Sequence, residues 1–460
     1  MNRKGFLKSV LGASALLGIP LSGKAEELSE INALLDVNRG TGNMLGFEAK
    51  PISKVRIGVI GLGNRGTTLL KMFEWLVQNE KAEIVALCDL KANKTQRAAE
   101  HLLQFQKKKV KQYHSSETAW KKVAERDDID LLLIATPWKW HTPMALYGMG
   151  NGKHVAVEVP IASTVEDCWK ITETAERTQQ HCIMLENCNY NEEELFVLNM
   201  VEQGVFGELT HAECAYIHDL RKHLLDDTYY ENQWRLQHHK ERNGNFYTTH
   251  GIGPVSFYYK IGRGDMFTHL TSMSSQEANL SAAAKKLGKD SAISCGDMNT
   301  TLLQTDKGRS VMMQFDVHTG RPYTRINKLC GTKAVHDGYP SRLYIDKEEL
   351  AYWGHQWLSA EEYNSYRTKY THPMISQLRS KMELFKEGHG GMDFVMIYRL
   401  ITCLNEGLPL DMNVYDGVIW SAITPLSELS VANGSNTVKM PDFMGGIWKE
   451  ERPLEIMRTL

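Results

Sequence analysis

The sequence predicts an α/β protein: an N-terminal doubly wound parallel sheet followed by an α+β C-terminal domain with a largely antiparallel open sheet. Apolar strand-like runs alternate with helix-forming stretches from residue 54 to about residue 187, which is typical of a parallel sheet. A glycine triplet follows the first run directly. After about residue 188 the long apolar runs give way to aromatic and histidine-rich segments with strand-like alternation, which predicts the second domain.

The first strand, residues 55–60, runs into Gly61-x-Gly63-x-x-Gly66, and a helix-forming stretch follows. In a Rossmann unit the first glycine allows the tight turn, the second lets the backbone approach a pyrophosphate, and the third lets the helix pack on the strand. The unpaired N–H groups of the helix N-terminus then bind the pyrophosphate. This pattern predicts a bound dinucleotide.

The second strand, residues 83–88, ends at Asp89. An acid at this place hydrogen-bonds a ribose 2′-hydroxyl, and its charge would repel a 2′-phosphate. Asp89 therefore favours NAD over NADP. The alternative interpretation is a residue that only shapes the turn after the strand.

Further apolar runs continue both domains. We expect parallel strands at residues 130–135, 153–159 and 182–185, then strands at 210–217 and 310–317, and a helix at 394–404. The predicted organisation is an NAD-binding Rossmann domain at 54–187 and a substrate-binding α+β domain with C-terminal helices at 188–460. Ligands would bind between them, at the carboxyl ends of the parallel strands.

Composition excludes several classes of function. With a net charge near −2, bulk electrostatics supports neither nucleic-acid nor membrane-surface binding. The eight cysteines form no CxxC pair, so neither a zinc site nor a disulfide scaffold is indicated. His238 and His239 are adjacent, but no carboxylate or cysteine pattern accompanies them, which favours an exposed polar pair over a metal site. We expect no metal.

The N-terminus predicts a signal peptide at residues 1–25 and a leader or linker at 26–53. A basic start precedes a short apolar run and small residues, and the run is too short to span a bilayer with ease. Arg3-Lys4-Gly5-Phe6-Leu7-Lys8 resembles a twin-arginine signal with Lys4 in place of the second arginine, and an ordinary secretory signal is the alternative. We expect an exported protein, periplasmic or secreted.

Four motifs occur together in an order found in one known family. They are the glycine triplet, Thr136-Pro137-x-x-x-His141, Glu158-Val159-Pro160 and Gly204-x-Phe206-Gly207-Glu208. From about residue 54 to residue 433 the chain resembles the family of glucose-fructose oxidoreductase, inositol dehydrogenase and related NAD(P)-dependent sugar enzymes. Two departures are informative. Val159 replaces a lysine that polarises the reacting hydroxyl, and the segment from His250 to Pro254 replaces an Asp-x-x-x-His pair.

One branch of that family matches more closely. Its resemblance rests on Gly244-Asn245-Phe246-Tyr247-Thr248-Thr249-His250, on Trp138-Lys139-Trp140-His141 and on Gly320-Arg321-Pro322-Tyr323. These segments are similar to the NAD-dependent glycosidases of glycoside hydrolase family 109. The resemblance implies removal of a terminal α-N-acetylgalactosamine (α-GalNAc) from oligosaccharides or glycoproteins.

The resemblance also implies a mechanism without the usual pair of carboxylates. Tightly held NAD+ takes hydride from C3 of the sugar, the C2 proton becomes acidic, and the glycosidic oxygen leaves C1 by elimination. Water adds, hydride returns to C3, and NAD+ is regenerated in each cycle. Alternatives are a periplasmic NAD(P)-dependent sugar oxidoreductase of the glucose-fructose oxidoreductase type and a non-catalytic sugar sensor.

Site residues follow from the motifs and their chemistry. His250 and Tyr247 are the expected catalytic pair, because histidine titrates near neutrality and a tyrosine can carry a proton if a positive charge lies near its phenol. Expected substrate contacts, besides these two, are Tyr216, Arg235 and Tyr323. Expected cofactor contacts are Gly61, Gly63, Asn64, Arg65, Gly66, Asp89, Trp138, His141, Glu158, Val159 and Asn187. The expected partners are a carbohydrate and, through the open sheet, a second copy of the chain.

Overall fold

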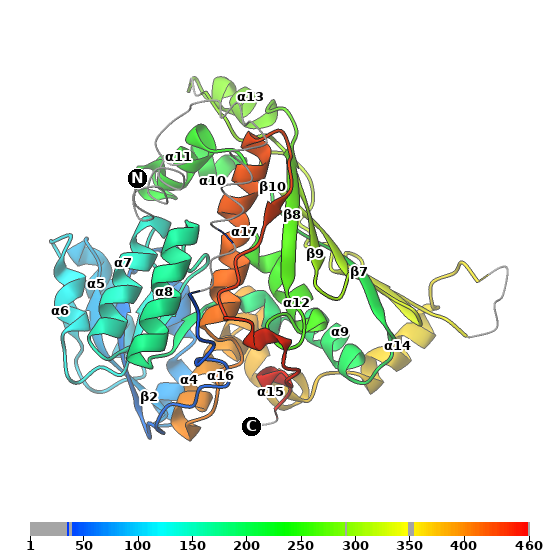
Figure 1. Ribbon diagram of the computed structural model, residues 1–460. Coiled ribbons are helices and arrows are strands. Elements are labelled where there is room, and N and C mark those ends of the chain that lie inside the picture. The colour runs from blue at the N-terminus through cyan, green and yellow to red at the C-terminus, as the bar shows by residue number, and fades with distance from the viewer. Residues whose placement is uncertain (1–34, 36–38, 290–291, 348–353, 459–460) are drawn as a thin grey trace.

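The computed structural model describes residues 35, 39–289, 292–347 and 354–458. The predicted signal peptide and the first part of the predicted linker lie outside these residues. Two sheets, each with its own helices, lie beside one another in the ribbon view (Figure 1).

Sheet A is the predicted parallel sheet, with the strand order β3-β2-β1-β4-β5-β6 and every pair parallel. The order reverses between β1 and β4, which is where ligands bind in such sheets. The three-residue β3 was not predicted, because it is short and mostly exposed. The strands are β1 (Val55–Ile60), β2 (Ala82–Cys88), β3 (Lys111–Tyr113), β4 (Leu131–Ile134), β5 (His154–Val157) and β6 (Cys182–Met184).

Helices cover both faces of sheet A, so β4 and β5 are buried along their whole length, as continuous apolar runs predict. These helices are α3 (Asn64–Lys71), α4 (Glu74–Gln78), α5 (Ala92–Leu102), α6 (Ala119–Ala124), α7 (His141–Gly150) and α8 (Val165–Thr178). Two short 3₁₀ turns follow strand ends, η1 (Trp138–Trp140) after β4 and η2 (Asn187–Tyr190) after β6.

Sheet B has the order β13-β12-β11-β7-β10-β9-β8-β14, in which β10 pairs parallel with β7 and the other pairs are antiparallel. This confirms a largely antiparallel second sheet. Along β9, buried and less buried residues alternate, so one face of the sheet is open. The strands are β7 (Leu209–Ile217), β8 (Phe267–Ser274), β9 (Asn299–Thr305), β10 (Ser310–Asp316), β11 (Lys328–Gly331), β12 (Ala334–Asp337), β13 (Arg342–Ile345) and β14 (Val438–Lys439).

Helices on the covered face of sheet B also join the two sheets. α12 (Thr249–Tyr259) packs on β7, and α17 (Val414–Ala432) packs on both β8 and α8. α16 (Met392–Glu406), the helix predicted at 394–404, contacts β1 and η2. The remaining helices are α9 (Glu192–Glu202), α10 (Arg221–Leu225), η3 (Glu231–Gln233), α11 (Trp234–Glu241), α13 (Asn279–Lys286), α14 (Ala360–Lys369), α15 (Pro373–Leu384), η4 (His389–Gly391), η5 (Ile447–Lys449) and η6 (Glu455–Met457).

Residues 39–53 of the predicted linker pack on the domains. The backbone N–H groups of Thr41 and Gly42 donate to Glu176 at 2.8 and 3.1 Å, and that of Met44 donates to the hydroxyl of Tyr415 at 3.2 Å. Within the described residues, no helix has the length and apolar character that crossing a membrane requires.

Candidate active site

The glycine turn after β1 has the geometry that the sequence predicts. Gly61 has a φ of +92°, and a Cβ there would lie 2.5 Å from the carbonyl oxygen of Ala135. A Cβ on Gly66 would lie 1.9 Å from the carbonyl oxygen of Gly61, so α3 could not approach the strand with any larger residue. A Cβ on Gly63 would meet no protein atom within 4 Å, and no side chain caps α3. The turn therefore presents open backbone and free N–H groups, which fits a dinucleotide pyrophosphate.

Asp89 at the end of β2 is half-buried beside this turn. Its carboxylate accepts hydrogen bonds from the N–H of Leu62 at 2.8 Å and of Lys91 at 2.9 Å. Asp89 thus has the turn-shaping role that we considered as the alternative. The ribose contact stays a prediction, and the position at the carboxyl end of β2 is the one that it requires.

Arg65, Glu158 and Asn187 are brought together by Asp393, a residue of α16 that the sequence did not reveal. Arg65 donates to Glu158 at 2.6 Å and to both oxygens of Asp393 at 2.6 and 2.9 Å. Asn187 donates to Asp393 at 2.7 Å. Burial alone would raise the pKa of Asp393, but the charges and hydrogen bonds of Arg65 and His389 together lower it. This ionised network fixes the start of α3, while Asn64 beside it is exposed.

His141 is 1% exposed and joins the loops that follow β4 and β5. Its Nδ1 lies 2.7 Å from the carbonyl oxygen of Pro160, and its Nε2 lies 2.7 Å from that of Thr136. Burial lowers the pKa of His141. The ring therefore positions both loops, and its direct contact with a cofactor stays a prediction. Val159, beside Pro160, is also buried.

The predicted catalytic and substrate residues lie together. The ring of Tyr247 is 4.3 Å from that of Tyr216 and 4.8 Å from that of His250, measured between centroids. Tyr323 lies 6.3 Å from Tyr216, and the guanidinium carbon of Arg235 lies 4.8 Å from the ring of Tyr247. Residues widely separated in the sequence thus form one aromatic and basic cluster.

Trp138 connects this cluster with sheet A. Its ring lies 6.3 Å from that of Tyr247 and 5.3 Å from the guanidinium carbon of Arg235. Glu231 of η3 also forms ion pairs with Lys91, at 3.1 Å, and with Lys94, both near the start of α5. In the ribbon view α10 and α11 accordingly lie above α7 (Figure 1). The cluster of predicted substrate residues therefore lies beside the edge of sheet A, next to Trp138, one of the predicted cofactor contacts.

Arg235 is 7% exposed, and it forms no ion pair with a carboxylate among the described residues. It donates to the hydroxyl of Tyr230 at 3.1 Å, while its Nε is buried without a hydrogen-bond partner. A buried guanidinium ordinarily has a carboxylate or several acceptors. These donors are suited to the hydroxyl and acetamido oxygens of a sugar.

The two central phenols remain protonated at neutral pH. Burial raises the pKa of Tyr216 to about 12, and burial raises that of Tyr247 well above its usual value. Arg235 lies close and acts in the opposite direction, as we expected of a nearby positive charge, but its effect is smaller. Both phenols are therefore hydrogen-bond or proton donors rather than bases.

Two residues of the cluster escaped the sequence analysis. Glu186 is fully buried, and its carboxylate lies 2.7 and 2.9 Å from Nδ1 of His250. Glu186 directly follows the strand predicted at 182–185. This position could have indicated a site residue, because ligands bind at the carboxyl ends of parallel strands. His218, for which the sequence offered no comparable signal, has its Nδ1 3.1 Å from the hydroxyl of Tyr216.

The glycines that follow His250 do not form a loop. Gly251 and Gly253 lie inside α12. A Cβ on Gly251 would lie 2.9 Å from the backbone nitrogen of Ala215, and one on Gly253 would lie 2.5 Å from Oδ1 of Asn189. The glycines allow α12 to pack closely on β7 and η2, and this packing sets the position of His250.

The expectation of an exposed His238–His239 pair is wrong. His239 is fully buried, and its Nδ1 lies 2.9 Å from Nε2 of His318, with Cys295 nearby. Burial and the neighbouring positive charges, including Arg235, lower the pKa of His239 well below its usual value. The three side chains are close enough to surround an ion, but the same positive charges oppose a cation there.

Comparisons with known proteins agree with this geometry. Residues 55–186 match the oxidoreductase family with an NAD-binding Rossmann fold, and residues 190–450 match the C-terminal domain of glycosyl hydrolase 109. The chain is 44% identical over 421 residues to an alpha-N-acetylgalactosaminidase of Shewanella oneidensis, covering 90% of each chain. It is 41% identical over 463 residues to a glycosyl hydrolase family 109 protein of Shewanella putrefaciens, covering 99% of each.

Solved structures share the fold at low sequence identity. Levoglucosan dehydrogenase in complex with NADH and levoglucosan is similar with a TM-score of 0.63 and 16% identity, covering 85% of this chain and 100% of that one. An NAD binding oxidoreductase from Klebsiella pneumoniae has a TM-score of 0.63 and 15% identity, covering 85% of this chain and 99% of the other.

Proposed function

Because the chain belongs to glycoside hydrolase family 109, we propose that it removes terminal α-GalNAc from oligosaccharides or glycoproteins by an NAD+-dependent cycle of oxidation, elimination and re-reduction. One observation carries the proposal. The carboxylates of Glu158 and Glu186, which both act on Tyr247, are each bound to a basic side chain, so neither is placed as a free acid or nucleophile. The cluster offers a histidine and protonated phenols, which suit proton transfer at C2.

The residues divide the chemistry between them. NAD+ held at the glycine turn supplies reversible hydride transfer at C3 of the sugar. A ketone at C3 acidifies the C2–H bond, and His250 accepts that proton. Tyr247 donates a proton or hydrogen bond to the glycosidic oxygen as its bond to C1 breaks. Water then adds at C1, the proton returns to C2 and hydride returns to C3, so the sugar leaves hydrolysed and otherwise unchanged.

Arg235 and the tyrosines bind the sugar in this proposal. The free donor of Arg235 binds the acetamido carbonyl, and Tyr216 and Tyr323 pack against the ring or its hydroxyls. NAD+ stays tightly bound and is regenerated in each turnover, which suits a protein outside the cytoplasm. We include export in the proposal, on the basic and apolar pattern at residues 1–25. Fractionation and N-terminal sequencing of the mature protein test that part.

The deciding experiment incubates purified protein with an aryl α-N-acetylgalactosaminide in D2O, without added NAD. We expect release of the phenol, deuterium at C2 of the released sugar, and a primary isotope effect when C3 of the substrate carries deuterium. Release without either isotope signature would replace the cycle by direct displacement at C1. Net reduction of the cofactor, with no phenol released, would assign the protein to the sugar oxidoreductases.

A further inference from the structure

A buried carboxylate lies directly behind the expected base. Glu186 is fully buried, whereas the side chain of His250 is 15% exposed, so only the histidine can meet a substrate. Both carboxylate oxygens face Nδ1 of His250, at 2.7 and 2.9 Å. Within the described residues, Nε2 of the same ring has no hydrogen-bond partner. We propose that Glu186 is a positioning residue that holds the Nδ1–H of His250 and leaves Nε2 as the proton-accepting atom.

The backbone fixes this pair. Oε1 of Glu186 also accepts the N–H of Cys188 at 3.0 Å, so the side chain caps η2 and cannot turn toward a ligand. A Cβ on Gly253 would lie 3.1 Å from Cγ of Glu186, which is tighter than an ordinary contact. The glycine therefore lets α12 approach η2 closely enough for the two side chains to meet.

An ionised carboxylate only accepts hydrogen bonds, so the ring nitrogen facing it carries the proton. In a neutral imidazole the other nitrogen then has the lone pair. Burial favours a neutral Glu186, but His250 and the backbone N–H of Cys188 are among the groups that together lower the pKa of this carboxyl. When Nε2 takes a proton, the carboxylate faces an imidazolium, and the net charge of the pair changes from −1 to zero.

The other titratable groups that face His250 stay neutral. They are Tyr247 before α12, Tyr216 and His218 from the β7 edge, and Cys188 of η2. Burial raises the pKa of the two phenols and of the Cys188 thiol, and burial lowers that of His218. The neighbouring cation is Arg235, across the ring of Tyr247. Glu186 is thus the charged group that can stabilise protonated His250 directly.

Glu186→Gln tests the assignment because glutamine keeps an acceptor and loses the charge. We expect kcat to fall by about 10²-fold, with KM and bound NAD unchanged. The acidic limb of the kcat profile moves to lower pH, because an amide stabilises the imidazolium less than a carboxylate does. Glu186→Asp keeps the negative charge, although the shorter side chain places the carboxylate farther from Nδ1 of His250. We expect this variant to recover part of the lost kcat. Wild-type kcat and pH profile in the Gln variant would overturn the proposal.

The chain offers a matched control. Glu193 lies 3.0 Å from Nε2 of the buried His336 in a second glutamate–histidine pair outside the cluster. Glu193→Gln makes the same chemical change, and we expect unchanged kcat and pH profile.

A second readout does not need turnover, and it matters because the inference rests on the proposed function. In protein with ¹⁵N-labelled histidine, NMR should show His250 as the Nδ1–H tautomer, and Glu186→Gln should weaken that preference, because an amide can either accept from or donate to Nδ1. An Nε2–H tautomer in the wild type would refute the positioning role. A locked Nδ1–H tautomer in protein that cleaves no α-GalNAc substrate would leave the positioning role standing and remove the proposed function.

Discussion

At the residue scale, the phenol of Tyr247 is a donor rather than a base. It lies between His250 and Arg235, and burial outweighs the positive charge, so its pKa is raised. Tyr247→Phe removes the proton and keeps the ring. We predict a fall in kcat of about 10²-fold with bound NAD retained, measured with an aryl glycoside and by NAD release on denaturation. A substrate with a highly acidic phenol, which needs no proton to leave, should recover most of the lost rate. No such recovery would contradict the donor role at the leaving oxygen.

The sequence predicted which residues gather at the site better than it predicted their burial and their hydrogen-bond partners. Tyr216, Tyr247 and His250 were found from motifs and do lie together. Glu186 and Asp393 were missed because a buried carboxylate is recognised by its partner, and both partners lie far along the chain. Whether His239 is buried likewise depends on tertiary packing, which local spacing does not encode.

At the element scale, the network at the start of α3 ties three segments together. Arg65 of α3 pairs with Glu158 after β5 and with Asp393 of α16, whose side chain is fully buried, while that of Arg65 is partly exposed. Asp393→Asn leaves Arg65 with one carboxylate. We predict a loss of stability of about 3 kcal/mol at pH 7 and weaker retention of NAD. Thermal unfolding with and without added NAD measures both.

The stability difference between wild type and Asp393→Asn should depend on pH in a definite direction. Arg65 lowers the pKa of Asp393 in the folded protein. The carboxylate therefore contributes its full stabilisation above the pKa that the group has in the unfolded chain, which is about 4. The contribution is lost as the pH falls through the folded value. The difference in melting temperature between wild type and Asp393→Asn should therefore shrink in acid. A difference that stays constant down to pH 3 would mean that the ion pair is not its cause.

Helices and strands were predictable where the pattern of apolar residues in the sequence matched the burial of the element in the fold. The predicted strands of sheet A were found because continuous apolar runs match strands buried on both faces. The first turns of α12 were not predicted as helix, because Gly251, Gly253 and Pro254 have low helix propensity. Close packing on β7 and η2 outweighs that propensity, and it requires glycine where the helix touches its neighbours.

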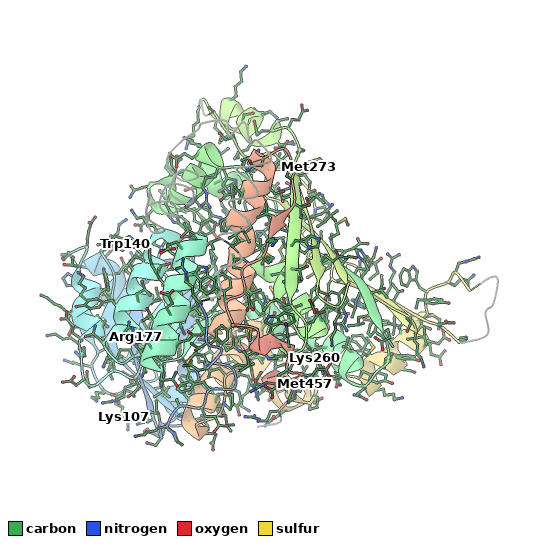
Figure 2. All side chains as sticks on the ribbon, viewed as in Figure 1. Lys107, Trp140, Arg177, Lys260, Met273 and Met457 are labelled. Carbon is green, nitrogen blue, oxygen red and sulfur yellow. The ribbon has the colours of Figure 1, made fainter. Side chains whose placement is uncertain are left out.

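At the scale of the whole molecule, one face of sheet B is exposed to solvent along β8 and β9 in a single chain. Met273 on β8 is 64% exposed and Leu302 on β9 is 51% exposed. In the strand register Met273 faces Thr300, so Leu302 is its diagonal neighbour. Figure 2 shows Met273 near the end of this sheet. We propose that a second copy of the chain covers this face, because side-by-side apolar side chains on an open sheet gain free energy when they are buried.

Met273→Glu combined with Leu302→Glu should convert a dimer into a monomer, because like charges would face one another across a two-fold interface. Sedimentation velocity at micromolar concentrations measures the change. Leu384→Glu on α15 is the matched control, since Leu384 is 71% exposed elsewhere and its replacement should leave the dimer intact. Neither change touches the cluster around His250, so kcat should stay at the wild-type value in both. A monomeric wild type, or a double variant that remains dimeric, would show that this face is not the interface.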